Sequence, residues 1–219
     1  MKSAVGLLLL ALSGALLIVL IQIEVVGVAF EKLGLSPGAA GLWMAASLFG
    51  SAINIPVTTL ASEPPPRDVL PAPLERLLHL PPLRHPGRTV LAVNVGGGVI
   101  PVLSAVFLLH HAALHPGVVV TAVGLVGLIC RLASRPLPGV GIGIPLFIPP
   151  LAAASCALLL DPANSAPLAY VCGTLGVLLG ADLARLGEIR RMGAPVASIG
   201  GAGTFDGIFL TGLVAVLLA

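Results

Sequence analysis

Long apolar runs with almost no charge recur along the whole chain, and they constrain its fold more than any motif. Charged residues make up 9% of the sequence and hydrophobic residues 57%, whereas a soluble domain carries roughly 25% charged residues. Each run approaches the roughly 20 residues that a helix needs to cross the hydrocarbon core of a bilayer. The sequence therefore predicts an all-α polytopic membrane bundle of about seven helices, forming one domain over residues 1–219. The predicted spans are 4–23, 38–60, 89–109, 117–132, 139–160, 167–186 and 197–218.

The basic residues predict how this bundle is oriented. With the N-terminus in the cytoplasm, Lys32 is the one basic residue in the outer segments, and the loop 61–88 is cytoplasmic. This distribution follows the positive-inside rule and predicts an outer C-terminus. The remaining basic residues then fall inside: Lys2, Arg67, Arg76, Arg84, Arg88, Arg131, Arg135, Arg185, Arg190 and Arg191.

The same composition excludes several classes of function. The basic residues are scattered at segment ends, which predicts a lipid bilayer as partner and no nucleic acid. Three cysteines lie in or beside apolar runs, which favours membrane-core packing over a disulfide or zinc framework. Three histidines near residue 110 face different ways on a helix, so we predict no metal and no cofactor.

The last span holds the strongest candidate for chemistry. Asp206 lies in its middle, behind the glycines Gly200, Gly201 and Gly203. An ionised carboxylate at that depth costs roughly 2.5–3.5 kcal/mol on insertion scales, so it needs a partner group or a bound proton. An intramembrane aspartate therefore indicates a functional site.

Asp182 in the preceding span is the natural partner for Asp206. If the sixth helix runs to Met192 and turns at Ala194, each aspartate lies about 18 Å from the turn at 1.5 Å per residue. Two carboxylates at one level would share a proton and act as an acid–base pair. The alternative interpretation pairs Asp182 with Arg185, one turn along the helix.

Two asparagines stand beside helix-breaking residues. Asn54 precedes Pro56 in the second span, and Asn94 precedes the glycines 96–98 in the third. Both side chains suit either a freed backbone carbonyl or a bound solute in a broken helix. The glycines 96–98 repeat the pattern of residues 200–203, which we attribute to close packing of small residues rather than to an internal repeat.

Two family resemblances follow from these motifs. The segments around Asn54, Asn94, Pro145, Asp182 and Asp206 together resemble a prokaryotic multi-pass membrane family, domain of unknown function sixteen-fourteen. That resemblance implies a prokaryotic cytoplasmic membrane location and names no activity.

The second resemblance covers the last two spans alone. Asp182-Leu and Gly201-Ala-Gly-Thr-Phe-Asp206-Gly are similar to the motifs of the intramembrane aspartyl proteases: presenilin, signal peptide peptidase and the prepilin peptidases. It implies Asp182 and Asp206 as catalytic residues. The chain departs from that pattern by the inserted Thr204-Phe205 and by Ala181, where presenilin-type enzymes have tyrosine.

Three functions remain open on the sequence. A di-aspartyl intramembrane hydrolase would act on a membrane-protein substrate, with the glycines before Asp206 admitting its backbone. A proton- or ion-coupled transporter would bind its ion at Asp206 and line a solute path with Asn54 and Asn94. A non-catalytic packing or assembly protein would use these polar residues only to join helices.

Overall fold

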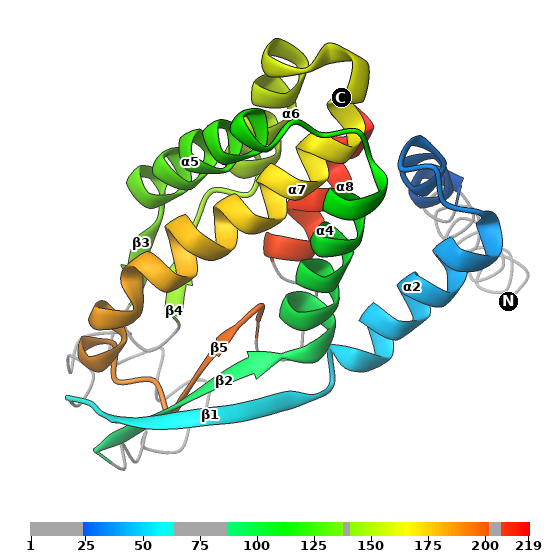
Figure 1. The fold of residues 1–219 in the computed structure, drawn as a ribbon. Coiled ribbons are helices and arrows are strands. Elements are labelled where there is room, and N and C mark those ends of the chain that lie inside the picture. Colours follow the sequence, from blue (N-terminus) through cyan, green and yellow to red (C-terminus); the bar gives the residue numbers. More distant parts are fainter. Residues whose placement is uncertain (1–23, 64–86, 138–140, 202–206) are drawn as a thin grey trace, which may run out of the picture.

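Figure 1 shows a helical bundle standing on a small β-sheet in a computed structural model of the protein. The structure describes residues 24–63, 87–137, 141–201 and 207–219. The predicted first span, 4–23, lies outside these residues, and so does most of the predicted cytoplasmic loop 61–88.

Helices α4 to α8 form the bundle around one apolar core. Fully buried alanines at many of the contacts allow the helix backbones to approach closely. Among them are Ala105, Ala122, Ala153, Ala169 and Ala215. The helices are α4 (Ile100–His111), α5 (Pro116–Ala133), α6 (Ile148–Leu160), α7 (Ser165–Val177) and α8 (Gly207–Leu218).

Two stretches of the described chain are apolar and long enough to cross a membrane. One is α5, which confirms a helix where the sequence predicts the span 117–132. The other is a continuous helical stretch over Pro162–Arg191, in which α7 is preceded by the 3₁₀ turn η2 (Pro162–Asn164). After α7 this stretch loosens into the π-helical η3 (Leu178–Asp182) and then tightens into the 3₁₀ helix η4 (Leu183–Arg191).

A three-stranded sheet lies at the lower end of the bundle in Figure 1. Its central strand β2 (Arg88–Asn94) pairs antiparallel with β1 (Asn54–Ala61) and parallel with β5 (Val196–Ile199). One face of β2 packs on the η4 helix, where Leu91 meets Ile189 and Met192.

Shorter elements complete the described fold. Helix α2 (Pro37–Gly50) follows a helical segment at residues 24–32 and leads into β1. Between α5 and α6, β3 (Arg135–Leu137) and β4 (Gly141–Gly143) form a hairpin.

The strands correct the expectation of an all-α bundle. The protein is mostly helical, but four of the predicted spans combine an extended segment with a shorter helix, and seven membrane-length helices are not found among the described residues. In each case the glycines or prolines lie where the extended and helical segments meet. The spans concerned are 38–60, 89–109, 139–160 and 197–218, which contain β1, β2, β4 and β5 respectively.

Candidate functional site

Asn54 and Asn94, which the sequence analysis selects separately, meet across the sheet. They are paired in the β1–β2 register, and the Nδ2 of Asn94 donates to the Oδ1 of Asn54 at 3.1 Å. Ser198 of β5 donates to the same oxygen at 2.6 Å. A polar cluster of Asn54, Asn94 and Ser198, here called the asparagine cluster, therefore joins all three strands.

Asn94 is fully buried and its hydrogen bonds are made within the protein. Its Nδ2 also donates to the carbonyl of Ser51 at 2.7 Å, just after the end of α2. Its Oδ1 accepts from the backbone N–H of Gly97 at 2.7 Å, as an N-cap residue does. Asn94 thus holds the glycine turn in place, whereas Asn54 is exposed.

The glycine turn η1 (Val95–Val99) is the point where three segments touch. A Cβ on Gly96 would lie 1.9 Å from the carbonyl oxygen of Ser47, and a Cβ on Gly97 would lie 2.1 Å from that of Gly200. Real Cβ atoms do not approach backbone so closely, so only glycine fits at both positions. Packing explains why residues 96–98 repeat the glycine pattern of residues 200–203: Gly97 and Gly98 lie directly against Gly200.

Gly200 and Gly201 end β5 in a left-handed backbone conformation. Their φ angles are +80° and +88°, which L-residues with a side chain rarely adopt. Gly200 is buried against the η1 turn. Gly203 and Asp206, the other candidate residues of this segment, lie outside the described residues.

Asp182 is half-buried at the junction of η3 and η4. The helix carrying it crosses α5 at very short distance, because Gly180 packs directly on the backbone of Gly127 and Gly176 packs on Val126. Glycines four residues apart permit such close crossings between membrane helices. The crossing fixes the position of Asp182 relative to α5.

Arg185 caps the end of α5 rather than serving Asp182 alone. Its side chain is buried, its Nε donates to Ser134 Oγ at 2.6 Å, and its Nη2 donates to the carbonyls of Arg131 and Ser134. A cation at a helix C-terminus is favoured by the helix dipole. Its Nη1 forms an ion pair with Glu188 at 2.7 Å. The three guanidinium nitrogens thus bind Ser134, Arg131 and Glu188.

The turn between the two aspartates lies where the sequence predicts it. The segments before and after the turn, however, differ in their rise per residue. The helix runs to Arg191, and Gly193 turns the chain with φ +66°. The next arm begins with strand β5, which rises about 3.3 Å per residue against about 1.5 Å in an α-helix. The assumption that the chain rises by an equal distance of about 18 Å on either side of the turn is therefore wrong. It cannot be used to compare the depths of Asp182 and Asp206.

Contacts between α7 and α8 give a better measure. The helices are antiparallel neighbours: Ser165 donates to the carbonyl of Ala219, and a Cβ on Gly173 would meet Thr211 at 3.2 Å. Extending this register sets Gly207, the first residue of α8, level with Val177. Gly207 is then about five residues, or roughly 7 Å along the axis, from the level of Asp182.

Sequence reasoning missed two parts of this region. One is the close crossing of α5 by Gly176 and Gly180, although the small-xxx-small spacing is visible in the sequence. The other is the Arg185–Ser134 cap, which joins distant residues and leaves no local signal. Within the described part of the chain, His, Cys, Asp and Glu side chains form no group of three that could hold a metal ion.

Comparisons with known proteins assign the chain to a family and to no activity. No curated protein and no solved structure matches the chain. A family whose description reads "Protein of unknown function (DUF1614)" matches residues 48–218, which include both asparagines, both aspartates and the whole sheet. The chain therefore belongs to the DUF1614 family.

Proposed function

We propose that this protein is an intramembrane aspartyl hydrolase in which Asp182 and Asp206 form the acid–base pair. The observation that carries the proposal is the α7–α8 register, which sets the first residue of α8 roughly 7 Å in axial level from Asp182. Asp206 directly precedes that residue in the chain. A carboxylate pair needs both groups on neighbouring elements at nearly one depth, and antiparallel α7 and α8 provide such neighbours.

The membrane location is part of the proposal. A second observation, added to the two membrane-length stretches, is that large apolar side chains face outward from the bundle. They include Leu132 of α5 at 74% exposure and Leu159 of α6 at 82%. A soluble monomer rarely exposes contiguous apolar surface of this kind. Such a surface suits contact with lipid tails, in the cytoplasmic membrane and orientation that the sequence predicts.

The chemistry would follow the aspartic-protease pattern. Two neighbouring carboxylates share one proton, because both cannot ionise cheaply at short distance. The ionised member takes a proton from water as that water attacks the substrate carbonyl carbon. The protonated member donates to the carbonyl oxygen, which gives a tetrahedral diol. As the C–N bond breaks, the proton taken from water passes to the leaving nitrogen, and one diol hydroxyl returns its proton to the second carboxylate, which restores the shared proton.

The sheet offers a place for a peptide substrate. Within the described sheet, β5 is an edge strand with a partner on one side, and it leads directly into Gly200 and Gly201. Extended peptides bind such edges by adding a strand. A substrate strand along β5 would run toward the segment that carries Asp206.

Two experiments test the proposal. In a background lacking Cys130, Cys156 and Cys172, Asp182→Cys and Asp206→Cys should form a disulfide, which requires Cα atoms within roughly 7 Å. Ser165→Cys with Ala219→Cys, at the other end of the same helix pair, is the positive control. Crosslinking of the control pair without the aspartate pair would refute the acid–base assignment.

The second experiment measures cleavage of a reconstituted membrane-protein substrate. Asp182→Asn and Asp206→Asn should each abolish it, while Asp161→Asn, in the loop before α7, should leave it unchanged. Activity that survives either of the first two changes would exclude a di-aspartyl mechanism.

The structure also favours a second candidate, a proton- or ion-coupled transporter. Helices α4, α6 and α8 are short and begin after extended segments, as the broken helices of transporters do. In that case proteoliposomes should show solute-dependent proton or ion flux. Asp206→Asn should abolish this flux, and Asp182→Asn should reduce it only in part.

A further inference from the structure

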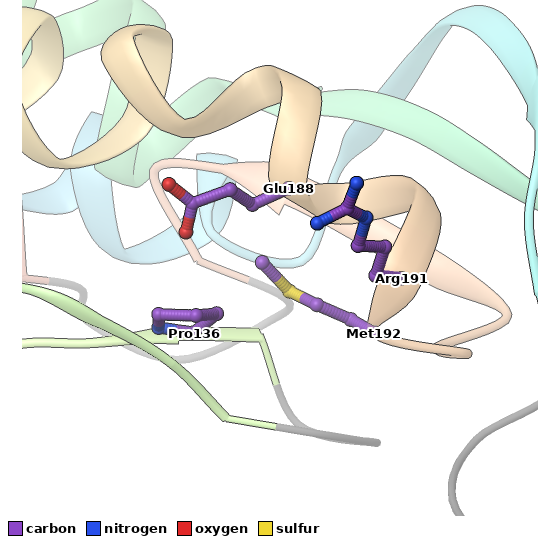
Figure 2. Close-up of a pocket in the computed structure, with 4 residues that line it drawn as sticks. All are labelled: Pro136, Glu188, Arg191 and Met192. Atoms are coloured by element: carbon purple, nitrogen blue, oxygen red, sulfur yellow. The ribbon is translucent and has the colours of Figure 1, made fainter.

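A cavity of about 380 Å³ lies between the β3–β4 hairpin and the end of η4, away from the asparagine cluster. Figure 2 shows its lining: Pro136 from β3, and Glu188, Arg191 and Met192 from the end of the long helical stretch. Neither the family assignment nor the proposed hydrolase uses this cavity.

Among the described residues that line the cavity, Arg191 is the one basic side chain and Glu188 the one acidic side chain. The Glu188 carboxylate is held by Arg185 at 2.7 Å and by Arg131 at 3.4 Å. Arg191 lines the cavity, is exposed, and has no ion pair with any residue that the structure describes. Exposed Arg135 directly precedes Pro136 on β3. An anionic group would therefore find a free guanidinium at this cavity and a carboxylate that is already neutralised.

Apolar surface leads away from the same place. Pro136 and Met192 form an apolar part of the lining, and Leu137 beside them is exposed. Leu128 and Leu132, four residues apart on α5, are exposed at 56% and 74%, and Arg131 beside Leu132 contacts the lining residue Glu188. A ligand with both an anionic head and a long apolar tail matches this arrangement.

We propose that the cavity binds the headgroup of an anionic phospholipid, with Arg191 contacting the phosphate and the acyl chains lying along Leu128 and Leu132. The proposal depends on the membrane location proposed above and is independent of the hydrolytic chemistry. A free phosphate ion would use Arg191 but would gain nothing from the apolar track, which selects the lipid. Basic pockets at the cytoplasmic ends of membrane helices bind acidic headgroups in this way.

Native mass spectrometry of the purified full chain, after extraction from vesicles containing phosphatidylglycerol and phosphatidylcholine, tests the site. We expect the chain to retain phosphatidylglycerol preferentially. Arg191→Gln should lower that retention about fivefold or more, as the loss of one arginine near a lipid surface implies. Arg190→Gln is the matched control, because this neighbour is also exposed and carries the same charge but does not line the cavity. It should lower retention clearly less than Arg191→Gln does.

Three outcomes would overturn the proposal. Equal losses for Arg190→Gln and Arg191→Gln would mean a diffuse surface attraction without a site. Equal retention of the two lipids would remove the headgroup preference. Displacement of the bound lipid by millimolar inorganic phosphate would assign the cavity to a free anion. A chain that sediments with membranes, with or without cleavage activity, and shows any of these results refutes the lipid site and leaves the proposed function untouched.

Discussion

Two units of this protein share one design: β2 followed by α4, and β5 followed by α8. In each, an apolar strand leads into glycines and then into a helix, and the two strands are parallel neighbours. They differ in what holds the glycines. The first unit has a buried asparagine, Asn94, bonded to the backbone of its own turn. The second has half-buried Ser198, two left-handed glycines and, next to its helix in the sequence, the acidic residue Asp206.

This difference indicates that the two units have different roles. The first unit satisfies its polar groups internally, so it serves as a scaffold against which Gly200 packs. The second unit carries the functional carboxylate of the proposed hydrolase. Substitutions in the first unit should therefore lower the free energy of unfolding most. A substitution at Ser198, the residue that the second unit contributes to the asparagine cluster, should lower it least.

The largest loss of stability is expected for Gly97→Ala. Its Cβ would lie 2.1 Å from the carbonyl oxygen of Gly200, so the two units would be pushed apart at the cost of roughly 3 kcal/mol. Thermal unfolding in detergent micelles measures the effect. Gly124→Ala on α5 is the control, because a Cβ there meets nothing within 4 Å, and its stability should be unchanged or slightly raised. Equal stability of the two variants would contradict the packing of the units.

A smaller loss is expected for Asn94→Ala. The change leaves the buried N–H of Gly97 and the carbonyl of Ser51 without their side-chain partner, at about 1–3 kcal/mol. Asn94→Asp keeps an acceptor for Gly97 but loses the donor to Ser51. It should therefore also unfold earlier than the unchanged protein. If Asn94→Ala abolished activity at full stability, Asn94 would be a ligand-binding residue and not a scaffold.

The smallest loss is expected for Ser198→Ala. It removes one hydrogen bond, to Asn54 at 2.6 Å, from a half-buried position, and Asn54 keeps its bond to Asn94. We expect about 0.5–1.5 kcal/mol by the same unfolding measurement. A cost above that of Asn94→Ala would reverse the proposed ranking of the two units.

Composition was enough to predict helical structure at α5 and over the Pro162–Arg191 stretch, because both are long and apolar. It misread β1, β2 and β5, because a buried or lipid-facing strand has the same hydropathy as a helix. The usable signal was local: Val-Thr-Thr in β1 and Thr-Val-Leu-Ala-Val in β2 are rich in β-branched residues and adjoin glycine or proline.

The individual residues of the candidate site were predictable from the sequence, but the contacts among them were less so. The carboxylates and the asparagines within the apolar runs are visible in the sequence because polar residues are rare there. The contact of Asn54 with Asn94 and Ser198 depends on strand pairing between distant segments, which the helical reading did not include. The Arg185 cap depends on where α5 ends relative to η4, and that is a tertiary relation.

The parallel pairing of β2 with β5 has a consequence for biosynthesis. Thr89, at the start of β2, bonds to the carbonyl of Ala194, 105 positions later. A ribosome adds about 5–20 residues per second, so β2 waits roughly 5–20 s for its second neighbour. During that delay the nascent chain exposes an unpaired strand edge, which is prone to wrong pairing. Translation arrest before β5 emerges should leave a misfolded product that cellular proteases remove.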